Sequence, residues 1–389
     1  MRAIRHVLSL GSALALAACG GGELDMNTEA EALGQTGAPL MQAAPGRAIA
    51  GEYIVVLKEG AAPQAVAAAA GVSPRFTYSV INGFAGSLSD AQLTALRNNP
   101  QVEYIEEDQV ATIDATQSSA TWGIDRIDQR GLPLSGSYTY TTTAGGVYSY
   151  IIDTGIYTSH TQFGGRAINV YDAVGGTGAD CNGHGTHGAG TVGAATYGVA
   201  KATRLRGVRV LDCNGSGSYS GIIAGIDWVR TNRVNPAIAN MSLGGGYSST
   251  VNTATNNLAT SGVYVAVAAG NSNADACNYS PASAAYATTV AATDRYDSRA
   301  SYSNYGSCID VYGPGSSITS TWNNGSTNTI SGTSMASPHV AGVGALYKAT
   351  YGNVSYSTID SWIKNNASVG YVKSNPSGTV NKLLWKGSL

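Results

Sequence analysis

Several long apolar runs that end or begin at a polar residue lie between about residue 147 and residue 347 of the sequence. Residues 263–269 (Val-Tyr-Val-Ala-Val-Ala-Ala) are apolar at every position, which predicts a strand buried on both faces. A second apolar run ends in Ile-Ile-Asp at Asp153. After Ser334, apolar positions follow with helical spacing, and a glycine and small residues precede them. We therefore expect the Ser334 hydroxyl to stand at a helix N-terminus.

A smaller pattern precedes these runs. Apolar stretches at 53–57, 76–88 and 102–105 predict strands, and the spacing over 90–98 predicts a helix. Residues 52–114 are therefore predicted to form a small α+β unit in the order strand, strand, helix, strand. Taken alone, this is an ordinary domain of that class.

The first residues have the features of a targeting segment. Arg2 and Arg5 precede an apolar stretch over 7–18 that is too short to span a bilayer. We interpret 1–19 as a signal peptide and expect the chain to be exported. Residues 16–19 (Leu-Ala-Ala-Cys) also resemble a bacterial lipobox, in which Cys19 would be lipidated and anchor the proprotein before release. Ordinary signal-peptidase cleavage nearby is the alternative. Residues 20–51, rich in Ala, Gly and Gln, predict a flexible linker.

Length and composition limit the function classes without choosing one. With 389 residues, 43% of them hydrophobic, the chain can bury a large core, and its length suggests two or three domains. The formal net charge of −2 argues for neither a nucleic-acid partner nor an anionic membrane surface.

Three residue types in glycine-flanked contexts point to nucleophilic catalysis. Asp153 precedes Thr-Gly, His184 lies in Asn-Gly-His-Gly-Thr-His-Gly, and Ser334 lies in Gly-Thr-Ser-Met-Ala. A serine hydroxyl attacks a carbonyl poorly unless an imidazole takes its proton, and a buried carboxylate orients that imidazole and stabilises its charge. We therefore predict Ser334 as nucleophile, His184 as base and Asp153 as the orienting acid. Any one of them alone would be more simply a helix cap, a core histidine or a turn aspartate.

Asn271 is the fourth candidate. It follows the buried strand predicted at 263–269, so its side-chain amide can donate to a developing oxyanion, with the backbone N–H of Ser334 as a second donor. The alternative is a turn asparagine after a strand.

Two other function classes fit less well. An α/β-hydrolase esterase requires a glycine two residues after the nucleophile and the order Ser, Asp, His, whereas Ala336 and the order Asp, His, Ser are found here. A noncatalytic exported binding protein on the same fold would be expected to lack a member of the triad, and none is missing.

The order Asp, His, Ser is that of subtilisin, and from about Glu52 onward the chain resembles the subtilisin-like serine peptidases. Within them it is similar to the proteinase K branch and its aqualysin-type members. Besides the triad contexts, the resemblance is carried by 115–117 (Ala-Thr-Gln), 122–124 (Trp-Gly-Ile), 214–217 (Asn-Gly-Ser-Gly), 240–246 (Asn-Met-Ser-Leu-Gly-Gly-Gly) and 303–307 (Ser-Asn-Tyr-Gly-Ser).

The resemblance implies an α/β fold of three layers with a mostly parallel central sheet, and endopeptidase activity with broad preference for apolar or aromatic P1 side chains. It implies that 52–114 is an inhibitory propeptide, which assists folding and then occupies the cleft. Self-cleavage near Ala115 would leave a peptidase domain of residues 115–389, which we expect to be a soluble monomer whose partners are protein and peptide substrates.

Substrate binding is expected to use backbone more than side chains. By the resemblance, an extended peptide would pair as a β-strand between two segments whose bare glycines allow close approach, and a third segment would line an open apolar S1 pocket. The two strand-like segments are Gly215, Ser216, Gly217 and Ser242, Leu243, Gly244, and the pocket segment is Ala268, Ala269, Gly270. No Asp or Glu lies among them, which argues against strict preference for Lys or Arg.

Four cysteines follow Cys19, namely Cys181, Cys213, Cys277 and Cys308, and an exported chain can oxidise them. Sequence alone allows three pairings. The family resemblance implies Cys181 with Cys213 and Cys277 with Cys308. A metal site is the alternative, but the spacing is not of the CxxC type.

Structural calcium is also implied by the resemblance. Its main site would use the carboxylate of Asp310 and the carbonyls of Ala285 and Ala287. A second group of hard oxygen ligands is offered by Asp125, Asp128, Gln129, Ser135 and Ser137, whose alternative is a solvated loop. A third site known in fungal relatives is not predicted, because Tyr371 stands where they have an aspartate.

Overall fold

The computed structural model describes residues 37–43, 48–109 and 115–389. They form two compact units, an N-terminal one that ends at Asp108 and a larger one that spans Gln109–Leu389. The predicted signal peptide, Cys19 and the residues just before Ala115 lie outside the described residues. Within the described part of the chain, no helix is both long and apolar enough to cross a membrane.

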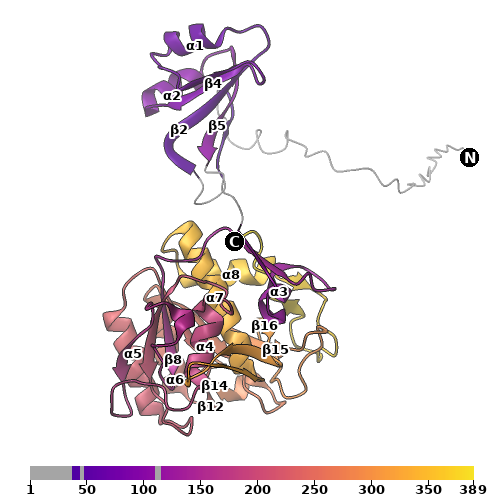
Figure 1. The fold of residues 1–389 in the computed structure, drawn as a ribbon. Coiled ribbons are helices and arrows are strands. Elements are labelled where there is room, and N and C mark those ends of the chain that lie inside the picture. Colours follow the sequence, from indigo (N-terminus) through magenta and orange to yellow (C-terminus); the bar gives the residue numbers. More distant parts are fainter. Residues whose placement is uncertain (1–36, 44–47, 110–114) are drawn as a thin grey trace, which may run out of the picture. The chain divides into compact units, whose positions relative to one another are not determined.

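The N-terminal unit is a five-stranded sheet with two helices packed against it (Figure 1). Its elements are β1 (Leu40–Met41), β2 (Ala48–Leu57), α1 (Pro63–Ala69), β3 (Phe76–Tyr78), β4 (Gly83–Ser87), α2 (Asp90–Arg97) and β5 (Val102–Gln109). The strand order is β1-β5-β2-β4-β3. Val55, Phe84, Leu96 and Ile105 form its buried core, so the unit has a hydrophobic centre of its own.

Two features of this unit differ from the sequence prediction. Helix α1 was not predicted, because its alanines give no contrast between an apolar and a polar face, although Pro63 stands in its first turn. Strand structure also begins before Glu52, since β1 pairs with β5 and β2 starts at Ala48. Part of the predicted linker is therefore sheet. The predicted helix is present as α2, and Ser89 and Gln92 form a capping box at its start.

The larger unit is built on a nine-stranded sheet in the order β19-β20-β16-β15-β13-β11-β8-β10-β9. Its strands are β8 (Tyr148–Asp153), β9 (Ile168–Asp172), β10 (Arg204–Arg209), β11 (Ala237–Met241), β13 (Tyr264–Ala268), β15 (Thr288–Thr293), β16 (Val311–Pro314), β19 (Ser368–Val369) and β20 (Lys382–Leu383). All pairings are parallel except that of β19 with β20. The predicted mostly parallel sheet is confirmed.

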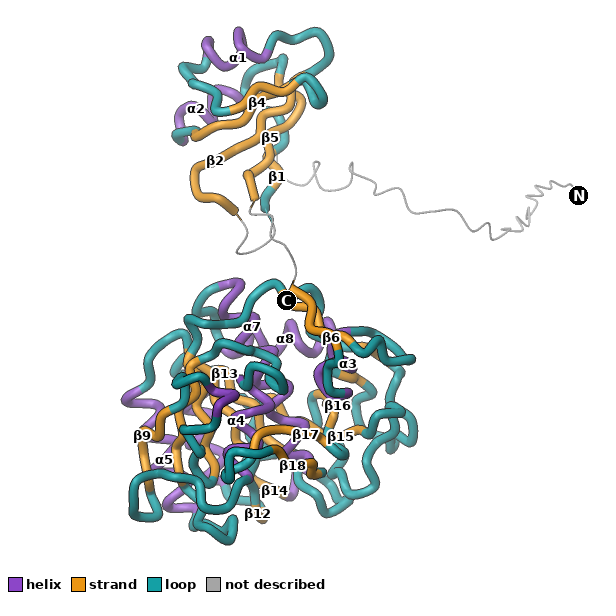
Figure 2. Tube along the Cα trace, viewed as in Figure 1, coloured by secondary structure: helices purple, strands orange, loops and turns teal. Residues whose placement is uncertain are grey.

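Helices cover both faces of this sheet and make three layers (Figure 2). The helices are α3 (Trp122–Asp128), α4 (His184–Gly193), α5 (Tyr219–Asn232), α6 (Ser249–Thr260), α7 (Thr333–Tyr351) and α8 (Tyr356–Asn366). In β8, Ile151 belongs to the core under α4 and α7, while its neighbour Ile152 belongs to the core under α5 and α6. Because both faces are buried, the strand is apolar at consecutive positions.

Shorter elements surround this sheet. They include the antiparallel pairs β6 (Ala115–Ser118) with β7 (Ser137–Tyr140), β12 (Gly245–Gly246) with β14 (Tyr279–Ser280), and β17 (Ile318–Thr321) with β18 (Thr327–Ile330), and the 3₁₀ turns η1 (Thr161–Phe163) and η2 (Ala276–Asn278).

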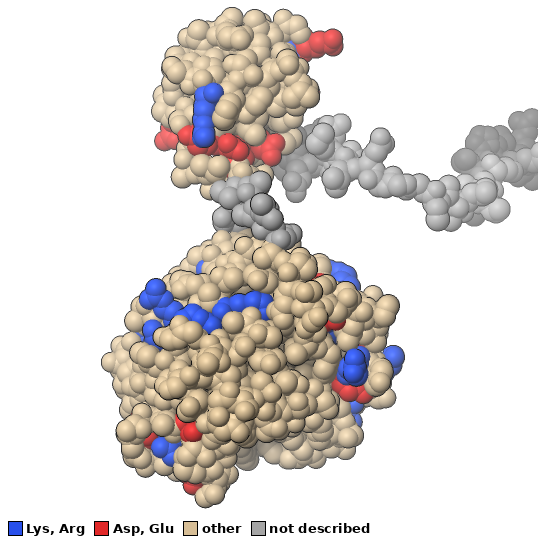
Figure 3. Space-filling model, in the orientation of Figure 1, with Lys and Arg blue, Asp and Glu red and all other residues tan. Residues whose placement is uncertain are grey.

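Most of the surface in Figure 3 is uncharged, in keeping with a chain in which 12% of the residues are charged.

Strand β8 lies at the point where the strand order reverses. After β8 the chain builds β9 and β10 on one side of it, then crosses to build β11 on the other. Ligands of open parallel sheets bind outside the carboxyl ends of the strands at such a point. Asp153 is the last residue of β8.

Candidate active site

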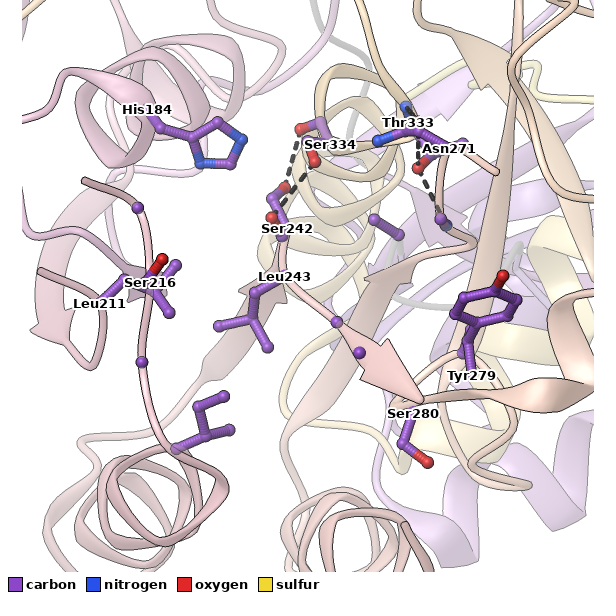
Figure 4. A pocket seen from close by; sticks show the side chains of 18 of the residues that line it. His184, Leu211, Ser216, Ser242, Leu243, Asn271, Tyr279, Ser280, Thr333 and Ser334 are labelled. Atoms are coloured by element: carbon purple, nitrogen blue, oxygen red, sulfur yellow. Dashed lines mark hydrogen bonds between the residues drawn. The ribbon is translucent and has the colours of Figure 1, made fainter. Parts of the chain in front are cut away.

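A cleft of about 650 Å³ opens at the carboxyl ends of the central strands (Figure 4). His184, Asn271 and Ser334 all line it, although they come from α4, the segment after β13 and α7. Asp153 lies behind His184 and is fully buried. The fold thus brings the four predicted catalytic residues to one place.

Asp153 and His184 form a close pair. The imidazole Nδ1 lies 2.8 Å and 3.0 Å from the two carboxylate oxygens. Burial of the imidazole lowers the pKa of His184, but the charge and hydrogen bond of Asp153, with the charge of Asp180, outweigh it and raise that pKa above 6.5. His184 is the first residue of α4, and Gly185 follows because a Cβ there would collide with the carbonyl of Gly155, 2.2 Å away. Only a glycine lets the helix approach the end of β8 so closely.

Ser334 is the second residue of α7, as the sequence predicted. Its hydroxyl donates to the carbonyl of Ser242 (3.2 Å), while the Ser242 hydroxyl donates to the carbonyl of Ser334 (2.7 Å). Asn240 joins the same network, since it donates to the Ser242 hydroxyl and accepts from Ser337. These bonds fix the first turn of α7 against the end of β11, and the Ser334 side chain faces the cleft opposite His184 (Figure 4).

The amide of Asn271 is oriented by Thr333. Its oxygen Oδ1 accepts from the backbone N–H (2.8 Å) and the hydroxyl (3.0 Å) of Thr333. The same hydroxyl accepts from the N–H of Gly270 (3.0 Å). Because Oδ1 is committed to Thr333, the NH₂ group is the part of the amide that remains to serve as a donor.

All nine residues predicted to bind substrate line the cleft, from Gly215 to Gly217, Ser242 to Gly244 and Ala268 to Gly270. Leu211, Ile222 and Tyr279 add apolar surface. None of the residues lining this cleft, which all belong to the described part of the chain, is Asp or Glu.

Both disulfides implied by the family resemblance are formed. Cys181 is bonded to Cys213, and Cys277 to Cys308. The first lies beside the cleft, since Asn182 and Asn214, the residues that follow its two cysteines, both line it.

The two predicted calcium positions differ in how well their residues fit the ion. At the first, Asp310 and the carbonyls of Ala285 and Ala287 have the right chemistry. One oxygen of Asp310 accepts from the N–H of Thr289 (2.8 Å), while the other lies 3.2 Å from the ammonium of Lys364. Calcium would have to compete with a cation that is already there.

At the second position, the Asp125 carboxylate accepts from the backbone N–H and the hydroxyl of Ser135 (3.2 Å and 2.9 Å). Gln129 accepts from the same N–H, and Ser137 lies within hydrogen-bond distance of the Ser135 hydroxyl. The carboxylate of Asp128 is instead bonded to Thr139 and to Lys386, 3.0 Å away. The residues gathered around Ser135 thus offer one carboxylate, a poor donor set for calcium.

Three residues at the site were missed in the sequence. Thr333 orients Asn271, and Thr154 and Asp180 join the end of β8 to the start of α4. Asp180 stands four residues before the first residue of α4, whereas a helix cap is recognised in a sequence directly before the helix. Nothing in the sequence around Thr333 or Thr154 indicates their partners, which are distant along the chain.

Most of the chain is similar in sequence to known proteins. Residues 146–384 match the subtilase family, and residues 66–114 match the peptidase inhibitor I9 family. The chain is 48% identical to the extracellular serine proteinase of Thermus sp. (strain Rt41A), over 90% of this chain and 92% of that protein. It is 49% identical to proteinase R of Parengyodontium album, over 90% and 92% of the two chains.

The crystal structure of a cold-adapted subtilisin-like serine proteinase superposes with a TM-score of 0.68 and 51% identity, over 70% of this chain and 99% of the other. The fold, the arrangement of Asp153, His184 and Ser334, and these similarities lead to one conclusion. The chain belongs to the subtilase family of serine endopeptidases and carries a peptidase inhibitor I9 domain ahead of its peptidase domain.

Proposed function

We propose that residues 115–389 form a secreted endopeptidase that hydrolyses peptide bonds through an acyl-enzyme, with Asp153, His184 and Ser334 as its triad. The observation that carries this proposal is the pairing of buried Asp153 with His184, which faces Ser334 and Asn271 across one cleft. The names of extracellular relatives support secretion.

In the first step the Ser334 hydroxyl turns from the Ser242 carbonyl toward His184. His184 accepts its proton as the oxygen attacks the substrate carbonyl, and Asp153 stabilises the imidazolium that results. The NH₂ group of Asn271 and the backbone N–H of Ser334 donate to the tetrahedral oxyanion. His184 then protonates the leaving amine, and later it activates the water that hydrolyses the acyl-enzyme.

We expect broad specificity with apolar or aromatic P1 side chains. Ala268, Ala269 and Gly270 leave an open pocket without a carboxylate to pair with Lys or Arg. The glycine-rich segments on either side would pair with the substrate backbone, so the sequence of the substrate would matter little beyond P1.

The N-terminal unit would act as an intramolecular inhibitor that assists folding and is removed by self-cleavage near Ala115. The match of 66–114 to the peptidase inhibitor I9 family supports this role. The domain limits 52–114 and 115–389, export through 1–19 and lipidation of Cys19 remain predictions, as does a monomeric mature enzyme.

Structural calcium also remains a prediction. Asp310 with the carbonyls of Ala285 and Ala287 would hold one ion and fasten the segment that leads into β15. A second ion at Asp125, Asp128, Gln129, Ser135 and Ser137 is less well supported, because Asp128 is engaged by Lys386.

Substitution Ser334→Ala tests the function directly. We expect at least a thousandfold loss of casein hydrolysis and a proprotein that stays uncut, whereas the wild type should begin near Ala115 by intact mass and N-terminal sequencing. A simple ester assayed alongside casein separates a peptidase from a dedicated esterase. Retention of more than about one per cent of peptidase activity would exclude Ser334 as the nucleophile.

A further inference from the structure

A second buried carboxylate lies beside the Asp153–His184 pair. Asp180 is 7% exposed and stands between β9 and α4. Its oxygen Oδ1 accepts from the hydroxyl of Thr154 (2.9 Å) and from the N–H groups of Asn182 (2.9 Å) and Gly183 (2.8 Å). Its oxygen Oδ2 accepts from the N–H (2.9 Å) and hydroxyl (2.5 Å) of Thr186. The carboxylate therefore has five donors and does not line the cleft.

These bonds join the two segments that carry the catalytic acid and base. Thr154 directly follows Asp153, and its hydroxyl donates to Asp180 while accepting from the N–H of Gly185 (2.9 Å). Gly183, the residue before α4, supplies no side-chain cap, and the free N–H groups at the start of the helix find other acceptors. The N–H of His184 donates to the side-chain oxygen of Asn182 (3.2 Å) and that of Gly185 to Thr154, while those of Gly183 and Thr186 donate to Asp180. A carboxylate at a helix N-terminus is also favoured by the helix dipole.

We propose that Asp180 is a positioning residue of the peptidase. It holds the first turn of α4 against the end of β8, so that the His184 imidazole stays in register with Asp153, and it places a second negative charge near the imidazolium that forms in each proton transfer. This inference rests on the proposed triad and adds to it a residue that touches neither substrate nor nucleophile.

The charge has a measurable signature. The charged or titratable groups that face His184 are Asp153 from β8, Asp180 from the loop and His187 from α4, and burial keeps His187 neutral by lowering its pKa to about 4. The other titratable side chains that line the cleft are Tyr219 and Tyr279. The negative charges of Asp153 and Asp180 both raise the pKa of His184. Because His184 must be neutral to accept a proton, removal of this charge should move the acid limb of the kcat/KM profile to lower pH.

Asp172 provides a matched control. It ends β9, in the same connection to α4, and its carboxylate accepts from the N–H groups of Val174 (2.8 Å), Gly175 (3.0 Å) and Gly178 (2.9 Å). It also pairs with Arg209 (3.3 Å), and none of these bonds reaches Asp153, Thr154 or His184. A purely structural role for Asp180 would make Asp180→Asn and Asp172→Asn behave alike.

The experiment compares mature wild type, Asp180→Asn, Asp172→Asn and Thr154→Val on a chromogenic peptide amide across the acid limb, with active sites counted by a serine-reactive phosphonate. For Asp180→Asn we expect kcat to fall about tenfold to a hundredfold with little change in KM, and the acid limb to move to lower pH. Asp172→Asn should do neither, even if its unfolding temperature falls. Thr154→Val, which removes the bridge and keeps the charge, should lower kcat without moving the limb.

The inference would be overturned if the acid limb of the kcat/KM profile stayed at the wild-type pH in Asp180→Asn. It would also be overturned if Asp172→Asn lost as much kcat as Asp180→Asn. Should Asp180→Asn fail to fold, an undiminished kcat in Thr154→Val would do the same. Ser334→Ala is run in the same assay. If it is active, the proposed triad itself fails; if it is inactive while Asp180→Asn matches the wild type, only the role of Asp180 fails.

Discussion

At the scale of single residues, the site depends on side chains that orient their neighbours. Thr333 is fully buried, yet its hydroxyl links the N–H of Gly270 to the amide oxygen of Asn271. The amide can therefore present its NH₂ group only in one direction. In the proposed mechanism, orientation of this donor before the reaction would make it effective in stabilising the oxyanion.

Substitutions of Asn271 and Thr333 test this arrangement. Asn271→Leu should lower kcat about a hundredfold to a thousandfold with KM nearly unchanged, the effect of removing one such donor from subtilisin, a relative. Thr333→Val keeps the backbone bond to Asn271 and should cost about tenfold. Thr255→Val, an equally buried change in α6, serves as control, and equal kcat values for it and Thr333→Val would contradict the prediction.

At the scale of elements, buried histidines connect α4 and α7 to their surroundings. His187 in α4 donates to the Ile318 carbonyl in β17 (2.9 Å), and His339 in α7 donates to the Met335 carbonyl one turn earlier (2.9 Å). Burial lowers the pKa of each to about 4 from an ordinary 6.5. Both are therefore neutral packing groups in the folded state at neutral pH.

This difference makes folding sensitive to acid. Between pH 6.5 and pH 4 these histidines are protonated in the unfolded chain but remain neutral in the folded protein. Protonation therefore favours the unfolded chain, and the free energy of unfolding falls as the pH drops from 6.5 toward 4. The loss is about 3 kcal/mol per histidine at most. His339→Gln should flatten the fall of the unfolding temperature over this window, measured on enzyme inactivated with a sulfonyl fluoride. An unchanged slope would show that His339 is not responsible.

At the scale of the whole molecule, much of the fold could be predicted because local patterns of apolar residues specify its main strands and helices. The strand at 263–269 and the helix after Ser334 are long and strongly patterned, and both are present as β13 and α7. Helix α1 was missed because alanine has no strong preference for either face. Thr154, Asp180 and Thr333 were missed because their roles depend on partners brought near by folding.

A lysine occupies the main predicted calcium position. Lys364 pairs with both Asp310 (3.2 Å) and Asp360 (2.6 Å), so it already supplies a positive charge at the main predicted calcium position. We expect only a small rise in unfolding temperature when millimolar calcium replaces a chelator. Lys364→Met should enlarge that rise, because the ion would no longer compete with an ammonium. A smaller calcium effect in the variant would argue that no ion binds at Asp310.

The position of Ser334, the proposed nucleophile, near the start of α7 also bears on when the proposed triad can be complete. As the chain emerges from the ribosome, the acid and the base appear well before the serine, and the parallel sheet that joins them draws on strands from the whole of the larger unit. A partly synthesised chain therefore holds no complete triad, whatever it has already folded. If the proposed triad is correct, proteolytic capacity would therefore come late in synthesis, independently of any inhibition by the N-terminal unit.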